Sequence, residues 1–248
     1  MSTQGKILAG VVVIFFVCLV AWVVLTTPPT PPPIEKVAPP TVMEYEGNTI
    51  TEEKDGQIIW ELSCDKLRVD TLTQNMELDN VRGKFYQHDK EKIWELTASR
   101  GVYYQSEKIV RVEDEVIVTN SDGAKLLCDE LEWHSEQELL TAIDNVSVTT
   151  NDGKELLCSK LMWNFKDELL TATDNVKITN SDGAKLWSDK IDWFTAEEKV
   201  IATGNVRISK DDMRGFGDLA YSENNFKKFG LLGNARVLKG VKDTEEGF

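Results

Sequence analysis

Hydrophobic and polar residues recur with a period of 30 through the second half of the chain. Trp133, Trp163 and Trp193 lie 30 residues apart, and the Asp-Gly and Asn-Val pairs around them keep the same spacing. Related copies contain Trp60 and Trp94 upstream, and the ending of the unit recurs downstream near residue 234. Internal repetition of this kind predicts about six stacked units, each a copy of one small motif.

Each unit is predicted to hold two strands. In one of them, residues 124–134 and 139–150 are bounded by Asp-Gly before the first segment and by Ser-Glu-Gln between the two. Apolar and polar residues alternate within these segments, as in half-buried strands. About twelve such strands in sequence predict an all-β body, which is a sandwich, a jelly roll or a solenoid.

The inward face is clear from the sequence in the second strand of each unit but not in the first. In the second strand, Leu140 and Val146 share one parity, and Asp144 and Asn145 between them predict a bulge or corner because Asn tolerates positive φ. In the first strand, apolar residues occupy both parities near its start. The sequence therefore leaves open which face of the first strand points inward.

The N-terminal segment has a different pattern. Residues 7–25 carry no charge, amide or hydroxyl, and as a helix they would be about 28 Å long, close to the hydrocarbon thickness of a bilayer. A cleaved signal peptide is the alternative, but its apolar region is shorter and ends in small residues. We therefore predict one uncleaved transmembrane helix from Ile7 to Leu25. Lys6 precedes it without an acid, which predicts a cytoplasmic N-terminus and an external body.

All seven prolines lie within residues 28–40. A segment so rich in proline is expected to be an extended polyproline II spacer. The absence of proline further along fits a sheet, because proline cannot donate to a strand ladder. The predicted organisation is a cytoplasmic tip and anchor at 1–27, the linker, a repeated β domain at 41–240 and a C-terminal tail at 241–248.

Charge and the scarcity of catalytic groups exclude several function classes. The chain has 28 basic and 42 acidic residues, a net charge of −14, whereas nucleic-acid binding needs Lys and Arg. His88 and His134 lie in no catalytic motif, so we predict no enzyme, no metal and no cofactor. Cys128 and Cys158 occupy equivalent positions in adjacent units, and we expect buried free thiols unless their strands are direct neighbours.

The repeated motif resembles that of a known family. Its form is Leu-x-(small)-Asp-x-x-x-aromatic, a turn, then Leu-x-Ala-x-(Gly/Asp)-Asn-Val, and it runs from Leu126 to Val146, then over 156–176 and 186–206. These units resemble the OstA-type β-jelly roll of lipopolysaccharide transport. With an uncleaved anchor ahead of them, they resemble the LptC family, its single-pass inner-membrane branch. The resemblance implies an elongated OstA/LptA-like β-jelly roll of two-strand units behind one transmembrane helix.

The resemblance also implies lipopolysaccharide transport across the periplasm. The anchored jelly roll would accept lipid from an inner-membrane ABC transporter and pass it to an LptA-like periplasmic jelly roll by edge-strand pairing. Acyl chains would lie in the apolar interior, and the acidic body would leave the anionic headgroup in solvent. The interior candidates for lipid contact are Leu126, Leu140, Ala142, Val146, Leu156, Leu170, Val176, Leu186 and Val206.

Two other function classes stay open on the residues alone. One is a structural β-solenoid with a packed interior that spans the envelope, and the other is a tethered polysaccharide-binding protein with exposed aromatic residues. The aromatic column of the repeats fits either a stacked core or the rim of an apolar groove. Its members are Tyr103, Trp133, Trp163 and Trp193.

Overall fold

The computed structural model describes a β domain. The chain divides into two units, Met1–Pro39 and Pro40–Phe248, and the described residues all belong to the second. The predicted anchor, linker and C-terminal tail lie outside the described residues. Within those residues, no helix is long and apolar enough to cross a membrane. The structure describes residues 42–54, 56–86, 93–223 and 228–240.

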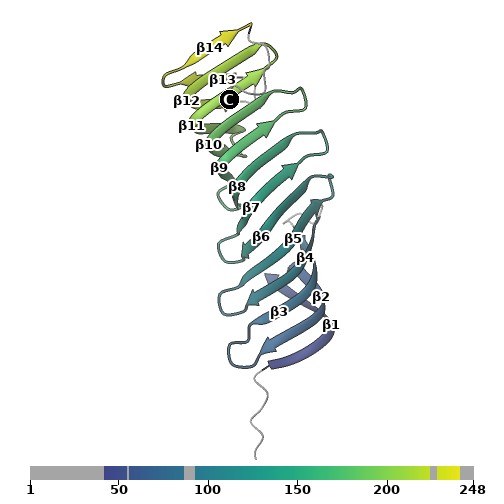
Figure 1. Cartoon of the computed structure of the whole chain (residues 1–248). Helices are drawn as coiled ribbons and strands as arrows, with labels where there is room; N and C mark the ends of the chain where they lie inside the picture. The colour runs from purple at the N-terminus through teal and green to yellow at the C-terminus, as the bar shows by residue number, and fades with distance from the viewer. Residues whose placement is uncertain (1–41, 55, 87–92, 224–227, 241–248) are drawn as a thin grey trace, which may run out of the picture. The chain divides into compact units, whose positions relative to one another are not determined.

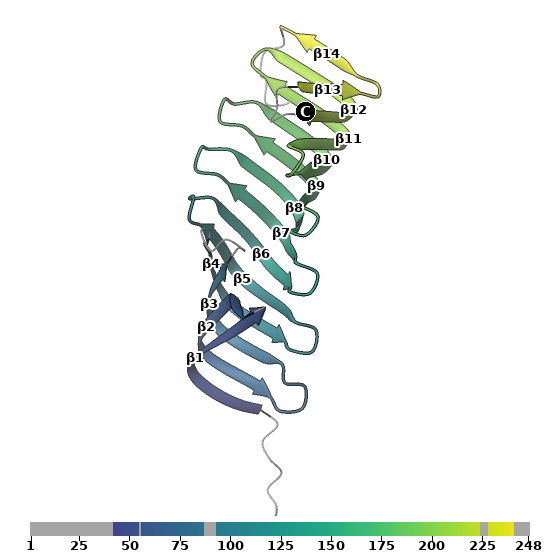
Figure 2. The same cartoon turned by 180° about the vertical axis from the view of Figure 1, so that it is seen from behind.

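Fourteen strands form one antiparallel sheet, and they follow one another in chain order (Figure 1, Figure 2). Each strand from β1 to β12 pairs with the next, and β14 pairs with β12 as β13 does. This arrangement confirms the prediction of an all-β repeat with two strands per unit. The strands are β1 Val42–Lys54, β2 Gln57–Asp70, β3 Met76–Tyr86, β4 Ile93–Tyr104, β5 Ile109–Asn120, β6 Lys125–His134, β7 Leu139–Thr149, β8 Glu155–Asn164, β9 Leu169–Thr179, β10 Lys185–Phe194, β11 Lys199–Lys210, β12 Met213–Glu223, β13 Lys228–Leu232 and β14 Arg236–Lys239.

Each repeat bends at one corner, as the sequence predicted. The ladder shifts register at Asp144 and Asn145 of β7, whose φ angles are 57° and 50°. The Asn145 side chain donates from Nδ2 to Oδ2 of Asp129 on β6 at 2.7 Å. The Asp and the Asn of the repeated motif are therefore the two partners of a corner hydrogen bond. Equivalent positive-φ pairs occur at 114–115, 174–175 and 204–205.

The corner decides which residues point inward in the first strand of each unit. In β6, Leu126 and Cys128 are buried before the corner, and Leu131 is buried after it. The inward parity therefore changes within one strand, which explains why the sequence shows apolar residues on both parities. The motif needs a small residue here because Cys158, the equivalent of Cys128, lies directly opposite Val146 inside the bend.

The bent sheet folds so that its two arms face each other. Ring contacts join strands that are not neighbours in the sheet. Trp60 of β2 meets Tyr103 of β4 with ring centroids 5.3 Å apart, and Trp94 of β4 meets Trp163 of β8 at 5.9 Å. The sheet stays open, because among the described strands β1 pairs only with β2.

Side chains completely fill the fold between β2 and β4. Trp60 and Leu62 have no accessible surface, and Leu78 and Leu96 are 1% exposed. A Cβ on Gly83 would lie 2.7 Å from Cδ2 of Leu62, so even a methyl group has no room there. We call Trp60, Leu62, Leu78 and Leu96 the N-terminal core. Side chains without accessible surface leave no water-sized space beside them, so this core is solid.

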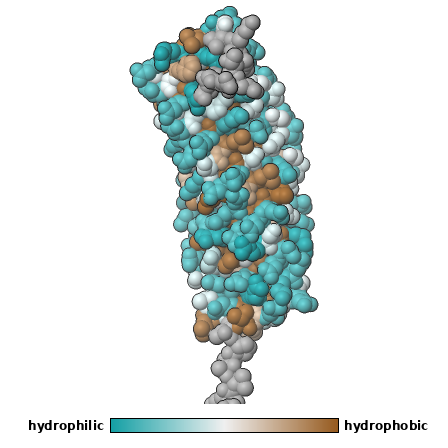
Figure 3. Space-filling model, in the orientation of Figure 1, coloured by the Kyte–Doolittle hydropathy of each residue, from teal (hydrophilic) through white to brown (hydrophobic). Residues whose placement is uncertain are grey.

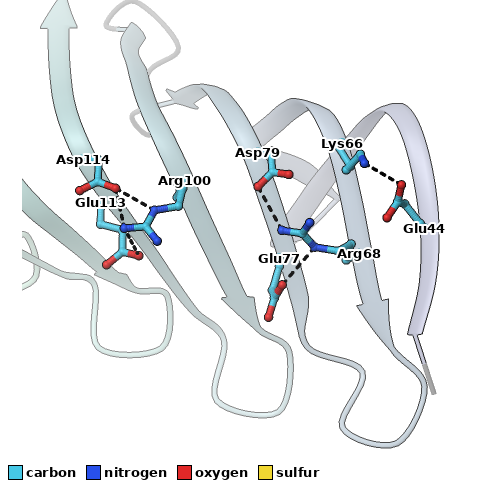
Figure 4. A network of polar contacts seen from close by, with 8 residues as sticks. All are labelled: Glu44, Lys66, Arg68, Glu77, Asp79, Arg100, Glu113 and Asp114. Atoms are coloured by element: carbon cyan, nitrogen blue, oxygen red, sulfur yellow. Dashed lines mark hydrogen bonds and ion pairs between the residues drawn. The ribbon is translucent and has the colours of Figure 1, made fainter.

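The outward face of β1–β5 carries ion pairs between neighbouring strands (Figure 4). Lys66 lies 2.7 Å from Glu44, and Arg68 lies 3.2 Å from both Glu77 and Asp79. A similar group joins β4 and β5. All these side chains are at least a third exposed, so each pair stabilises the sheet only slightly. The ion pairs identify this face as the solvent side, and both Arg68 and Arg100 on it are paired with carboxylates.

The three cysteines of the β domain, Cys64, Cys128 and Cys158, are buried free thiols, as expected. Cys128 lies on β6 and Cys158 on β8, with β7 between them. Two strand spacings separate them by about 10 Å, which is beyond the reach of a disulfide. The strands of Cys128 and Cys158 are therefore not direct neighbours, and no disulfide joins these two cysteines.

We expect these thiols to react slowly in the folded protein. Burial raises the pKa of Cys128 to about 12 and that of Cys158 to about 11, from the usual 9.0. Almost no reactive thiolate is then present near pH 8. Maleimide labelling of the full-length Cys18→Ser variant should become fast only in denaturant. Labelling of Cys128 within seconds under native conditions would contradict the burial.

The same pKa values predict a loss of stability at alkaline pH. Above pH 9 the thiols ionise in the unfolded chain but stay protonated in the folded protein until pH 11–12. The free energy of unfolding should therefore fall as pH rises through this window. Replacing both Cys128 and Cys158 with Ala should reduce the slope, measured by urea unfolding at a series of pH values. An unchanged slope would show that other groups dominate.

Candidate functional site

An apolar groove of 1390 Å³ lies between the two arms of the sheet, mainly along β6–β12. Residues in register on successive strands build each wall, because a row of inward side chains runs across the ladder. On one arm, large aromatic and aliphatic residues alternate between neighbouring strands. The residues that define the groove are Trp133, Leu140, Trp163, Leu170, Trp193 and Val200 on that arm and Leu126, Val148, Leu156, Ile178, Leu186 and Ile208 on the other.

The groove is not filled by the protein's own side chains. Leu140, Leu170 and Leu186 are only partly buried, in contrast to the N-terminal core. Figure 3 shows apolar side chains visible between polar ones along the β domain. Within the aromatic column, Tyr103 is 8% exposed and Trp193, three repeats later, is 42% exposed. The column thus serves as core at one end and lines an open groove at the other.

Six of the nine residues predicted to face the interior line the groove. The other three are 1% exposed and lie at the corners, directly after the positive-φ pairs, where they pack inside the bend. Contact of the first six with lipid stays a prediction. The six are Leu126, Leu140, Ala142, Leu156, Leu170 and Leu186, and the three corner residues are Val146, Val176 and Val206.

Three site residues that the sequence prediction missed lie on the second arm. Val148, Ile178 and Ile208 all line the groove, and each follows the valine of the Asn-Val pair by two residues. Residues two apart in a strand share a face. Extending the alternation past the corner is the signal that would have found them.

An aromatic cluster closes the groove toward the N-terminal core. Trp163 stacks on Phe165 with centroids 4.4 Å apart, and Trp94 from β4 packs edge-on against Trp163. At the same margin, Nζ of Lys54 lies 2.6 Å from Oε1 of Glu138. These contacts join the ends of β1 and β4 to β6–β8, so the groove is covered here and more open toward β10–β12.

The site offers apolar binding and little else chemically. Among the residues that the structure describes, no group of three His, Cys, Asp or Glu side chains is arranged to hold a metal ion. His134 lies 3.5 Å from Glu132, and that pair contacts Arg111 outside the groove. His88 lies outside the described residues. The arrangement therefore fits a protein that shelters apolar chains from water.

A bent, open, antiparallel sheet around an unfilled apolar groove defines a class of apolar-chain binders. The family model of "Lipopolysaccharide-assembly, LptC-related" proteins matches residues 10–186, which is more than half of the chain. The chain therefore belongs to the LptC-related family, and this membership supports a part in lipopolysaccharide transport in general.

One solved structure illustrates the likeness. It is the crystal structure of LptH, the LptA-homologous periplasmic component of the lipopolysaccharide transport device of Pseudomonas aeruginosa. The match covers 47% of this chain and 94% of that chain, with a TM-score of 0.43 and 10% sequence identity. No curated protein sequence matches this chain significantly.

Proposed function

We propose that the groove holds the acyl chains of lipopolysaccharide during transport through the periplasm. The observation that carries this proposal is the row of partly exposed apolar side chains that face open space. Such a surface is stabilised when an apolar ligand covers it. At roughly 30 Å³ for a group the size of water, 1390 Å³ holds on the order of 40 methylene groups, enough for several acyl chains.

The lipid path runs sideways rather than from end to end. The N-terminal core fills the interior across the middle of β2–β4, because its side chains leave no accessible space, and the groove reaches these strands only at their ends, for example at Ile59, Phe85 and Trp94. Acyl chains would therefore reach the groove between the two rows of turns or from the β12–β14 end. A fully packed structural solenoid is not supported, since Leu140, Leu170 and Leu186 between the arms of β7–β11 are only partly buried.

We also propose the cellular setting. Residues 7–25 would anchor the chain in the inner membrane, with the N-terminus in the cytoplasm and the β domain in the periplasm. An inner-membrane ABC transporter would supply the lipid, and an LptA-like periplasmic jelly roll would receive it. Among the described strands, β1 pairs only with β2 and β14 only with β12, and such edges support strand addition by these partners. Tyr45 on β1 is 45% exposed, and Val237 on β14 is 67% exposed.

Photocrosslinking in cells tests the groove. A benzophenone amino acid at Leu140 or Leu170 should capture lipopolysaccharide, because both side chains line the groove. Leu127 is the control position and should give little capture, because it is 37% exposed and does not line the groove. Silence at both groove positions in a folded protein would refute the proposal. Capture at Leu127 equal to that at Leu140 would also show that the groove is not where the lipid lies.

A further inference from the structure

The residues that line the groove include more cationic than anionic side chains, although the chain as a whole is acidic. Five lining side chains are cationic and three, Glu138, Glu155 and Asp182, are anionic, which reverses the balance of 28 to 42 in the whole sequence. Three of the cationic residues follow one row of turns. We call this set the lysine edge: Lys154 before β8, Lys185 at the start of β10 and Lys210 at the end of β11.

The spacing of the lysine edge follows from the repeat. The turns that carry these residues join β7 to β8, β9 to β10 and β11 to β12, so neighbouring turns are two strand spacings apart. Lysine residues therefore recur about every 10 Å along the groove. Beside each charge lies apolar lining: Leu156 follows Lys154 by two residues, and Leu186 directly follows Lys185.

Two lysines of the lysine edge form ion pairs with aspartates of the turns, but these pairs still allow the lysines to bind an anion. Nζ of Lys154 lies 2.7 Å from Asp152 and Nζ of Lys210 lies 2.6 Å from Asp182, but the two lysine side chains are 52% and 48% exposed. Such exposed pairs are weak, and an ammonium has three donors. Within the described part of the chain, Lys185 makes no ion pair.

A buried arginine lies beside this edge. Arg214 of β12 lines the groove and is 2% exposed. Its Nη1 donates to the backbone carbonyls of Asp211 and Met213 at 3.0 and 2.8 Å, which holds the guanidinium at the end of the row of lysines.

We propose that the lysine edge binds the phosphate groups of an acylated lipid whose chains occupy the groove. This inference rests on the proposed function and adds a headgroup site to it. The half-exposed Trp193 on the opposite arm completes the arrangement, because lysine and tryptophan side chains together suit the boundary between acyl chains and headgroups. The excess of negative charge in the chain then lies outside the groove, whereas the residues that line the groove carry a small excess of positive charge.

The test compares lipid A with and without its phosphate groups. Full-length protein in phosphatidylcholine nanodiscs carries a photocrosslinker at Leu170, and the lipid concentration for half-maximal crosslinking is measured. The phosphorylated lipid should need a roughly tenfold lower concentration at low salt, given several lysines near the phosphates. The variant K154Q/K185Q/K210Q should abolish this preference.

The matched control removes the same charge elsewhere. In K160Q/K166Q/K177Q, three lysines that do not line the groove are replaced, and the preference for phosphorylated lipid should persist. Circular dichroism checks that both variants fold. Equal half-maximal concentrations in the unsubstituted protein, or an unchanged preference in K154Q/K185Q/K210Q, would overturn the lysine edge and leave the groove intact.

Two further outcomes separate this inference from the function on which it rests. If neither lipid crosslinks at Leu170 in the unsubstituted protein, the proposed function fails as well. If inorganic phosphate at the same concentration as the lipid removes the preference, the lysines bind free phosphate, and their assignment to a lipid headgroup is wrong.

Discussion

Replacing Leu170 with arginine is expected to abolish lipid binding while leaving the sheet folded. Leu170 is partly exposed to the groove and lies in register between Trp163 and Trp193. In the empty protein, a long arginine side chain can reach toward water from this position. With acyl chains in the groove, the guanidinium would be desolvated without a partner. We expect affinity to fall by roughly a hundredfold or more, because burying an unpaired charge is so unfavourable.

The measurement is lipopolysaccharide capture by a photocrosslinker at Leu140, two strands before Leu170 in the same row. Leu127→Arg is the matched control, because Leu127 lies outside the groove and is 37% exposed. Thermal unfolding followed by circular dichroism confirms that both variants are folded. Capture by folded Leu170→Arg at the level of the Leu127→Arg control would show that lipid does not occupy this part of the groove.

A corner residue should respond differently to the same substitution. Val176 is 1% exposed inside the bend and does not line the groove. Arginine there would place a charge inside packed side chains with no route to solvent. The Val176→Arg variant is therefore unsuitable for testing transport, because a folding defect would precede any effect on lipid.

The second large effect concerns stability. Leu62→Ala is expected to lower the free energy of unfolding by about 3–5 kcal/mol, since a fully buried leucine leaves a cavity that tight surroundings cannot fill. Leu140→Ala removes the same atoms from a side chain that is only partly buried. Its loss should be about 1–2 kcal/mol, because fewer contacts disappear and water can occupy the space.

Urea unfolding of the two full-length variants measures this difference. Sequential strands in an open sheet can unfold in parts, as in repeat proteins. Amide hydrogen exchange should therefore accompany the urea curves and locate the loss at β2–β4 for Leu62→Ala. Equal losses in the two variants would mean that the N-terminal core and the groove walls are packed alike, which would remove the basis for the sideways path.

Much of the fold was predictable because its signals are local. The 30-residue period marks strand pairs, and the alternation around Leu140 and Val146 marks one face of β7. Asp144 and Asn145 predicted the corner because few other residues tolerate positive φ. The strands and bulges therefore follow from the conformational preferences of a few residues at regular intervals.

The candidate site was only partly predictable. Leu140 and Leu170 line the groove, whereas Val146 shares their face but is buried in the bend. Parity assigns a side chain to a face and cannot tell whether that face meets open space or another side chain. Leu126 and Leu131 show the same limit, because the corner between them turns opposite parities to the same interior.

The sequence by itself determined the repeat, the strand pairs and the corners, since each depends on neighbours within one unit. Only the tertiary structure decided where the interior is filled and where it is open. That difference arises when the arms meet: Trp60 packs against Tyr103 at one end, while Trp193, in the same aromatic column, remains 42% exposed. Such contacts form between residues far apart in the chain, and no local pattern specifies them.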